Sequence, residues 1–148
     1  MPAAGQTLYD AVGGEAFFVR LVEAFYDGVA DDPVLLRIYP EAPDLTGASQ
    51  RLRLFLIQYW GGPTTYSDER GHPRLRMRHL PFHIGGEERD RWLTHMLAAV
   101  DEATAELPAD LRDEVAGALR GYFMPAAEQM RNDSGLPITP SGRSDLRQ

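Results

Sequence analysis

The sequence contains no cysteine and no lysine. Without cysteine, the chain has no disulfides, no thiolate metal ligands and no cysteine nucleophile. No apolar run approaches the roughly 20 residues needed to cross a bilayer, so the sequence excludes a membrane span. Residues 1–6 lack the basic start and the apolar stretch of a secretory signal. Together with the missing cysteines, this leads us to expect a cytoplasmic protein.

All 15 cationic side chains are arginines, and 22 acidic residues bring the net charge to −7. A negative net charge opposes binding to phosphate polymers, so we expect no nucleic-acid partner. A small acidic cofactor held by local arginines is the more natural anionic partner. The 148 residues, 43% of them hydrophobic, are enough for one domain with its own core. We place this domain at residues 1–131 and predict a disordered tail over 132–148, where apolar residues are few.

Apolar side chains recur at helical spacing in four long stretches, and no alternating strand pattern stands out. The sequence therefore predicts an all-α fold. Asp32 and Pro33 predict the cap and the first residue of a short helix. The predicted segments are a helix over about 14–30, a short helix to Tyr39, a helix over about 45–59, a long helix carrying Trp92 to Val100, and a last helix from about Ala109.

Glycine and proline predict where these helices are interrupted. Gly61-Gly62-Pro63 ends the third segment. The polar composition of residues 64–73 predicts an irregular loop, and residues 74–79 form a basic segment of one or two helical turns. Pro125 removes a backbone donor and is expected to kink or fray the last helix.

Four histidines are available as metal ligands. His79 and His83 have the i, i+4 spacing of a helical metal site, but Pro81 lies between them and disfavours the required helix. His72 in a polar loop is expected to be exposed, and His95 beside an apolar helix face is expected at the edge of the core. His79 precedes an apolar Leu-Pro-Phe frame that suits a flat ligand. The spacing alone leaves the role of His79 open between ligand and ordinary helix-end residue.

Three aromatic residues with polar ends, Tyr26, Tyr39 and Trp92, lie on or near apolar helix faces. They are either core residues whose polar ends reach a carbonyl or solvent, or donors that converge on a ligand in an apolar cavity. Four arginines in two segments either form a solvated basic surface or bind carboxylates. These arginines are Arg51, Arg74, Arg76 and Arg78.

Six blocks follow one another in an order and spacing that are hard to match by chance. They are Tyr9-Asp10-Ala11-Val12-Gly13-Gly14, Phe25-Tyr26, Tyr39-Pro40, Arg51-Leu52-Arg53, Gln58-Tyr59-Trp60-Gly61-Gly62-Pro63, and the run from Gly71 to His79. Over Leu8 to about Phe123 the chain resembles the truncated haemoglobins. The likeness is closest to their group II, the bacterial O type.

The resemblance implies a two-over-two helical sandwich around haem b, with the iron held by His79. Ala48 then takes the position of the distal histidine of ordinary globins. The residues that the resemblance assigns to the haem are Arg51, which would pair with a propionate, and Leu52, Tyr66, Met77, His79 and Trp92. Those that it assigns to the bound ligand are Tyr26, Tyr39, Ala48, Leu52 and Trp92.

The function that the resemblance implies is binding of O2, CO, NO or other small ligands, with oxygen transport as one role. Nitric oxide dioxygenase or peroxidase activity, supported by an unidentified reductant, is the alternative, and homo-oligomer formation stays open. A metal-dependent helical-bundle hydrolase using His72, His79 and His83 is a more remote hypothesis. A helical interaction protein without cofactor is another. An absorption spectrum distinguishes them, because haem in a globin gives an intense Soret band.

Overall fold

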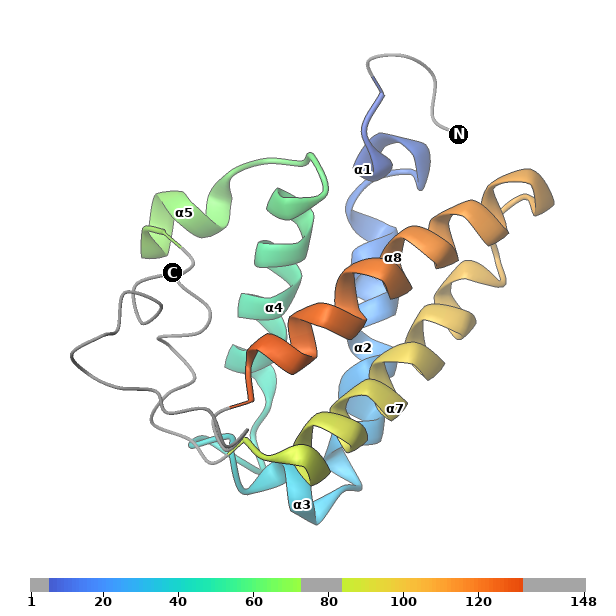
Figure 1. Cartoon of the computed structure of the whole chain (residues 1–148). Coiled ribbons are helices and arrows are strands. Elements are labelled where there is room, and N and C mark those ends of the chain that lie inside the picture. Colours follow the sequence, from blue (N-terminus) through green and yellow to red (C-terminus); the bar gives the residue numbers. More distant parts are fainter. Residues whose placement is uncertain (1–5, 73–83, 132–148) are drawn as a thin grey trace.

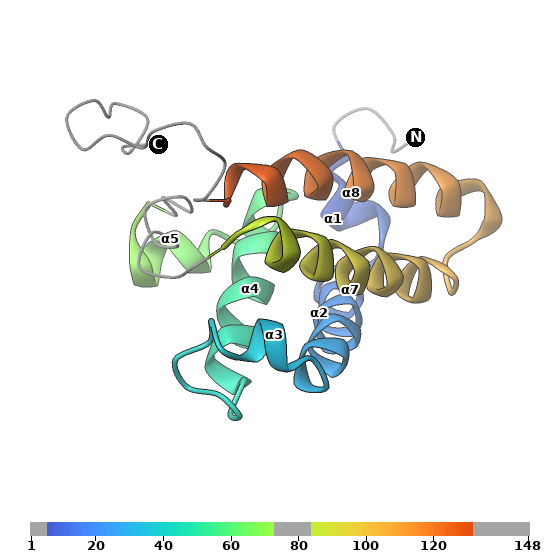
Figure 2. The same cartoon turned by 60° about the horizontal axis from the view of Figure 1, so that its bottom comes forward.

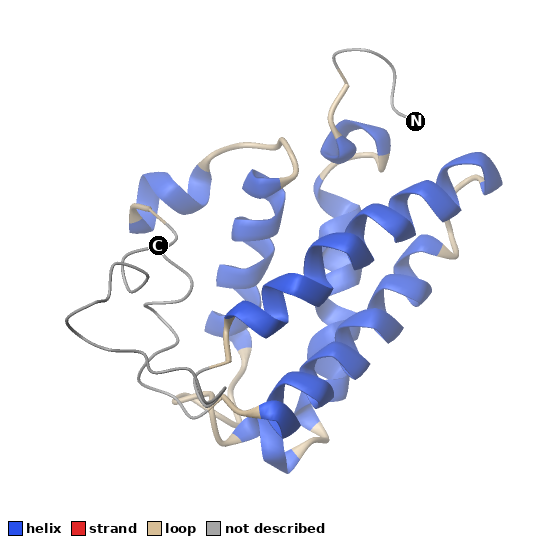
Figure 3. Cartoon of the chain, viewed as in Figure 1, coloured by secondary structure: helices blue, strands red, loops and turns tan. Residues whose placement is uncertain are grey.

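The computed structural model describes residues 6–72 and 84–131, and within these ranges the regular elements are helices (Figures 1 and 3). The all-α prediction is confirmed. The helices are α1 (Leu8–Ala11), α2 (Glu15–Ala30), α3 (Pro33–Leu36), α4 (Thr46–Tyr59), α5 (Thr65–Arg70), α7 (Gly86–Thr104) and α8 (Ala109–Gln129).

Local signals explain where several helices begin and end. Asp32 caps α3 by accepting hydrogen bonds from the backbone N–H groups of Val34 and Leu35, and Pro33 is the first helical residue, as predicted. α4 ends at Tyr59, where Gly61 has a φ of 106° that other residues rarely adopt. The short α3 ends at Leu36 rather than at the predicted Tyr39.

Two short helices differ from the sequence predictions. α1 was not predicted; the Thr7 side chain accepts from the Asp10 N–H, and the Asp10 carboxylate accepts from Thr7 in return. The predicted irregular loop over 64–73 is wrong in part, because α5 occupies most of it. Gln58 holds α5 in place by accepting from the Ser67 N–H at 2.9 Å and donating to its hydroxyl at 2.8 Å.

α8 continues past Pro125 to Gln129, so of the two predicted alternatives the frayed end is wrong, and the kink stays a prediction. Proline removes only the bond that its own nitrogen would donate to the carbonyl four residues earlier. The turn beyond it is anchored by packing, since Ala127 is 6% exposed.

The long helices form two pairs that cross each other (Figures 1 and 2). α7 and α8 are neighbours joined by a short connection, and this pair lies over α2 and α4, with α2 contacting both α7 and α4. This is the predicted two-over-two arrangement. Fully buried side chains at the crossing, among them Phe17, Phe18, Phe25, Met96, Leu119 and Phe123, form the core. No helix in the described part of the chain has both the length and the apolar character required of a membrane span.

Candidate functional site

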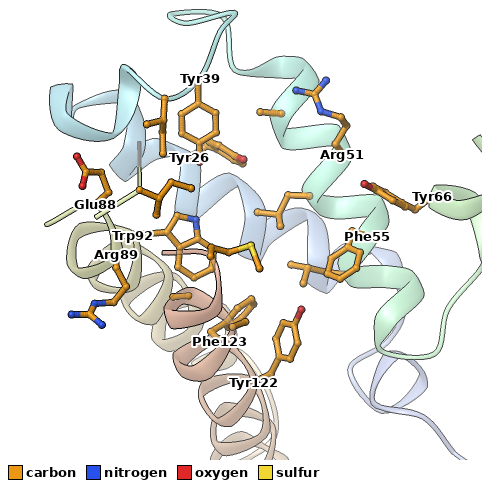
Figure 4. Close-up of a pocket in the computed structure, with 18 of the residues that line it drawn as sticks. Tyr26, Tyr39, Arg51, Phe55, Tyr66, Glu88, Arg89, Trp92, Tyr122 and Phe123 are labelled. Carbon is orange, nitrogen blue, oxygen red and sulfur yellow. The ribbon is translucent and has the colours of Figure 1, made fainter. Parts of the chain in front are cut away.

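A cavity of about 450 Å³ opens between the two helix pairs, where α5 and the segment after α3 complete its walls (Figure 4). Its lining is mainly apolar and aromatic. The lining residues are Tyr26, Ile38, Tyr39, Pro40, Ala48, Arg51, Leu52, Phe55, Leu56, Tyr66, Arg70, Ile84, Glu88, Arg89, Trp92, Tyr122, Phe123, Ala126, Ala127 and Met130. A mainly apolar cavity with a few polar groups is the usual form of a small-molecule site.

Tyr26, Tyr39 and Trp92 come together on one side of this cavity (Figure 4). The ring centroids of Tyr26 and Tyr39 are 5.8 Å apart, and the ring of Phe25 lies 4.8 Å from Tyr26 and 5.2 Å from Trp92. The two tyrosine side chains also influence each other electrostatically. Burial raises the pKa of both phenols, that of Tyr39 to about 12, so both keep their protons at neutral pH. The cavity therefore has hydroxyl and indole donors at one end.

α4 supplies the wall next to these donors. Ala48, Leu52 and Phe55 line the cavity from this helix, as does Arg51, whose guanidinium lies 3.9 Å from the Glu41 carboxylate. Ala48 and Leu52 lie one turn apart, so they share a helix face, and their side chains have no strong hydrogen-bonding groups. This part of the cavity can contact a ligand without hydrogen-bonding to it.

Two further arginines, which the sequence analysis did not single out, also line the cavity. Arg70 on α5 lies with its guanidinium carbon 5.9 Å from the centre of the Tyr66 ring, a cation–π contact. Arg89 on α7 pairs with Asp90 and with Glu128 of α8. With Arg51, the described lining thus includes three guanidinium groups.

His79 and Met77 lie outside the described residues, as do His83, Arg74, Arg76 and Arg78. The chain on either side of this segment does reach the cavity. Tyr66 and Arg70 of α5 line it before the segment, and Ile84 lines it directly after. Tyr66, which the resemblance placed against a haem, is 4% exposed.

His72 and His95 do not line the cavity. His72 is exposed, as expected. His95 on α7 has a partner that the sequence did not indicate: its Nε2 lies 2.8 Å from the carboxylate of Asp32. The same carboxylate is 5% exposed and accepts a hydrogen bond from Arg91 at 3.1 Å. The three side chains, Asp32, Arg91 and His95, form a cluster that we call the α3–α7 clamp.

Glu88 is a second buried carboxylate that sequence reasoning missed. It is 3% exposed and lines the cavity at the start of α7. Its Oε1 accepts from the N–H of Gly85 at 2.9 Å, and its Oε2 accepts from Arg37 at 3.0 Å. The spacing of Gly85 and Glu88 is that of a helix-start motif, but the pairing with Arg37 joins residues that are distant in the sequence.

Two crossed helix pairs around an apolar cavity with aromatic donors define a small helical globin. A family model described as bacterial-like globin matches residues 7–121. The group 2 truncated haemoglobin YjbI of Bacillus subtilis is 43% identical over 111 residues, which cover 75% of this chain and 80% of that protein. The chain therefore belongs to the bacterial-like globins, as a group II truncated haemoglobin.

Solved structures agree with this assignment. A thermostable haemoglobin from Thermobifida fusca is similar with a TM-score of 0.79 and 59% identity, over 87% of this chain and 99% of that one. The truncated oxygen-avid haemoglobin of Bacillus subtilis is similar with a TM-score of 0.74 and 39% identity, over 86% of this chain and 100% of that one.

Proposed function

We propose that this chain holds haem b in the described cavity, with His79 as the protein ligand to iron, and that it reversibly binds O2 and other diatomic ligands. Membership of the truncated haemoglobins supports the cofactor. Haem, when bound, supplies a ferrous iron that takes up diatomic gases, and a histidine ligand favours reversible binding. The proposal for His79 rests on the motif that ends in this residue and on the cavity-lining residues at both ends of its segment.

The donor set of the cavity fits a haem. A flat macrocycle is mainly apolar and bears two carboxylates, and the cavity combines aromatic and aliphatic walls with Arg51, Arg70 and Arg89. Guanidinium groups bind carboxylates with good geometry, so these arginines would hold the propionates. We assign one propionate to Arg51, whose present partner Glu41 is a weak competitor at 3.9 Å with an exposed side chain.

The observation that carries the gas-binding function is the group of donors formed by Tyr26, Tyr39 and Trp92. Their hydroxyls and indole N–H face a cavity whose lining is mainly apolar, so they can stabilise a ligand that gains negative charge. The raised pKa of each phenol keeps a proton available for this hydrogen bond. Apolar Leu52 and Phe55 limit the access of water to the same space.

The same donors favour a second role. Several hydrogen bonds to one ligand slow its release, which suits retention and reaction better than delivery. One similar protein, the truncated haemoglobin of Bacillus subtilis, is oxygen-avid. Oxidation of NO to nitrate by O2, with one electron from an external reductant, is therefore the second candidate function.

The deciding experiment is the absorption spectrum of the purified full chain after addition of haemin and reduction. We expect an intense Soret band that shifts on exposure to CO. His79→Ala should lose stable haem or bind it only with added imidazole, whereas His72→Ala, at an exposed histidine, should match the wild type. Wild-type spectra in His79→Ala would contradict the ligand assignment, and absence of a Soret band in the wild type would contradict the cofactor.

A further inference from the structure

Glu88 is a buried carboxylate that the proposed gas binding leaves without a role. It is 3% exposed and lines the cavity at the start of α7 (Figure 4). Burial of a charge is costly unless the charge is paired and hydrogen-bonded. Oε2 of Glu88 accepts a hydrogen bond from Arg37, and Oε1 accepts one from the Gly85 N–H. The carboxylate therefore joins α7 to the residue that directly follows α3.

Each side chain of this ion pair is close in sequence to a donor of the cavity. Glu88 precedes Trp92 by four residues, so the two side chains lie one turn apart on the same face of α7, and both line the cavity. Arg37 precedes Tyr39 by two residues, in a tight turn where the Tyr39 N–H donates to the Leu36 carbonyl at 3.0 Å. A shift of Glu88 is therefore passed on to Trp92, and a shift of Arg37 to Tyr39.

α3 is held to α7 at its other end as well. The α3–α7 clamp joins Asp32, which caps α3, to Arg91 and His95 of α7. The start and the end of α3 are thus each bonded to α7 through a buried carboxylate. Two attachments fix the orientation of a short helix, whereas one attachment lets it pivot. The attachment through Glu88 is the one at the cavity, because Glu88 lines the cavity and the three clamp residues do not.

We propose that Arg37 and Glu88 are positioning residues that set the separation of Tyr39 and Trp92, and thereby the alignment of their hydrogen bonds to a bound diatomic ligand. This inference rests on the proposed gas binding. Hydrogen bonds weaken steeply as their angle departs from linearity, so alignment decides how much each donor contributes. Bound O2 carries more negative charge than bound CO and depends more on these donors. The ion pair therefore adjusts the preference for O2 over CO from outside the group of donors.

Arg37→Gln tests the proposal in the full haem-loaded chain. The Arg37 side chain is 58% exposed and does not line the cavity, so its replacement leaves the walls of the cavity intact. We expect the O2 dissociation rate to rise about two- to fivefold, because the donors are misaligned rather than lost. The CO dissociation rate should change less. The infrared C–O stretching band of the ferrous CO complex should shift, which a loss of stability alone would not cause.

Arg120→Gln is the matched control. Arg120 on α8 also pairs with a carboxylate of α7, that of Asp101, but neither residue lines the cavity. The control should leave the O2 dissociation rate and the C–O band as in the wild type. The same substitution at the two arginines therefore compares an ion pair at the cavity with one away from it.

Glu88→Gln separates positioning from a direct effect of charge. If the ion pair positions the donors, loss of either partner raises the O2 dissociation rate. If Arg37 acts only by offsetting the charge of Glu88 in the cavity, Arg37→Gln speeds O2 release but Glu88→Gln slows it. In a Trp92→Phe background one of the two positioned donors is gone, so Arg37→Gln should then change the rate less than about twofold.

The outcomes also separate the ion pair from the cofactor. A normal Soret band with wild-type O2 rates and C–O band in Arg37→Gln would overturn the positioning role and leave the proposed function standing. Opposite effects of Arg37→Gln and Glu88→Gln, or an undiminished effect in the Trp92→Phe background, would also overturn it. A wild type that takes up no haem would overturn both proposals. Faster O2 release in both variants, with unchanged rates in Arg120→Gln, would support the positioning role.

Discussion

At the scale of single residues, the hydrogen-bond donors of Tyr26, Tyr39 and Trp92 are supplied by three separate segments of chain. Figure 4 shows the indole nitrogen of Trp92 on the side of Tyr26 and Tyr39. The rings of Tyr26 and Tyr39 are in contact and their phenols influence each other, so we expect a change at one of them to alter what the other can donate. The three side chains therefore act as one network rather than as three independent contacts.

We expect Trp92→Phe and Tyr26→Phe each to raise the O2 dissociation rate of the ferrous haem protein. A neutral hydrogen bond contributes about 0.5–1.5 kcal/mol, which corresponds to about two- to tenfold in rate. The double variant should show less than the product of the two effects, because the network is shared. The CO dissociation rate should change less, since bound CO carries less charge. Stopped-flow measurements on the three variants and the wild type test this.

Tyr9→Phe serves as the control, because it removes a hydroxyl outside the cavity. Wild-type O2 rates in all three cavity variants would mean that these aromatics are packing residues only.

The sequence predicted some of the functional residues but not the buried ion pairs. The aromatic donors and Arg51 came from the family motifs, and the structure places all of them in one cavity. The ion pairs of Asp32 and Glu88 were missed, because their partners are 51 to 63 residues away along the chain. No local pattern indicates which distant cation will meet a buried carboxylate. Only the cap role of Asp32 was visible, because a cap acts within three residues.

At the scale of elements, the α3–α7 clamp fixes α7 beside α2 and α3. Arg91 and His95 both bond to Asp32, and Trp92 lies between them on the same helix. His95 also packs closely on α2, since a Cβ added at Gly28 would lie 2.4 Å from its Nδ1. A glycine at this position lets the two helices approach. The clamp therefore positions the helix that carries one of the cavity donors.

Asp32→Asn should lower the free energy of unfolding by about 1–3 kcal/mol, because it removes the buried carboxylate that pairs with both Arg91 and His95. Glu87→Gln is the matched control. It removes an exposed partner of the same Arg91, at 3.2 Å, and should cost about 0–1 kcal/mol. Urea denaturation of both variants at neutral pH gives the comparison. Equal losses in the two variants would contradict a special role for the buried carboxylate.

The clamp also predicts a pH dependence. Burial alone would raise the pKa of Asp32, but hydrogen bonds from His95 and Leu35 and the charge of Arg91 hold it below its usual value of 3.8. A lowered pKa in the folded state means that the stabilisation is complete above about pH 4 and is lost as the pH falls through the folded value. The wild type should therefore lose stability below pH 4 more steeply than Asp32→Asn.

The elements themselves were largely predictable. Apolar periodicity gave the four long helices, Pro33 gave the start of the short α3, and Gly61 gave the end of α4. α5 was not predicted, because its six residues are mostly polar and its position depends on Gln58 of another helix. How the two helix pairs cross could not be read from periodicity, which says which face is buried but not what covers it. That part of the prediction came from the family resemblance.

At the scale of the whole molecule, we propose that residues 132–148 lie outside the folding unit. α8 ends at Gln129, and the last buried apolar side chain of the described residues is Ala127. The family model ends earlier, at residue 121. Deletion of 132–148 should therefore shift Tm by less than about 2–4 °C, the shift produced by roughly 1 kcal/mol at this size. A larger drop in differential scanning calorimetry would show that the segment contributes to the fold.

Pro125 makes the stability of α8 uneven along its length. Because Pro125 has no N–H, the carbonyl of Gly121 receives no helical bond from it, and the last turn is held to the rest of α8 by one bond fewer. Ala126, Ala127 and Met130, which line the cavity, lie on this turn or just after it. Local unfolding that begins here costs less free energy than opening the core. We therefore expect the end of α8 to unfold locally before the core does, which would open this side of the cavity while the rest of the helix pairs stays folded.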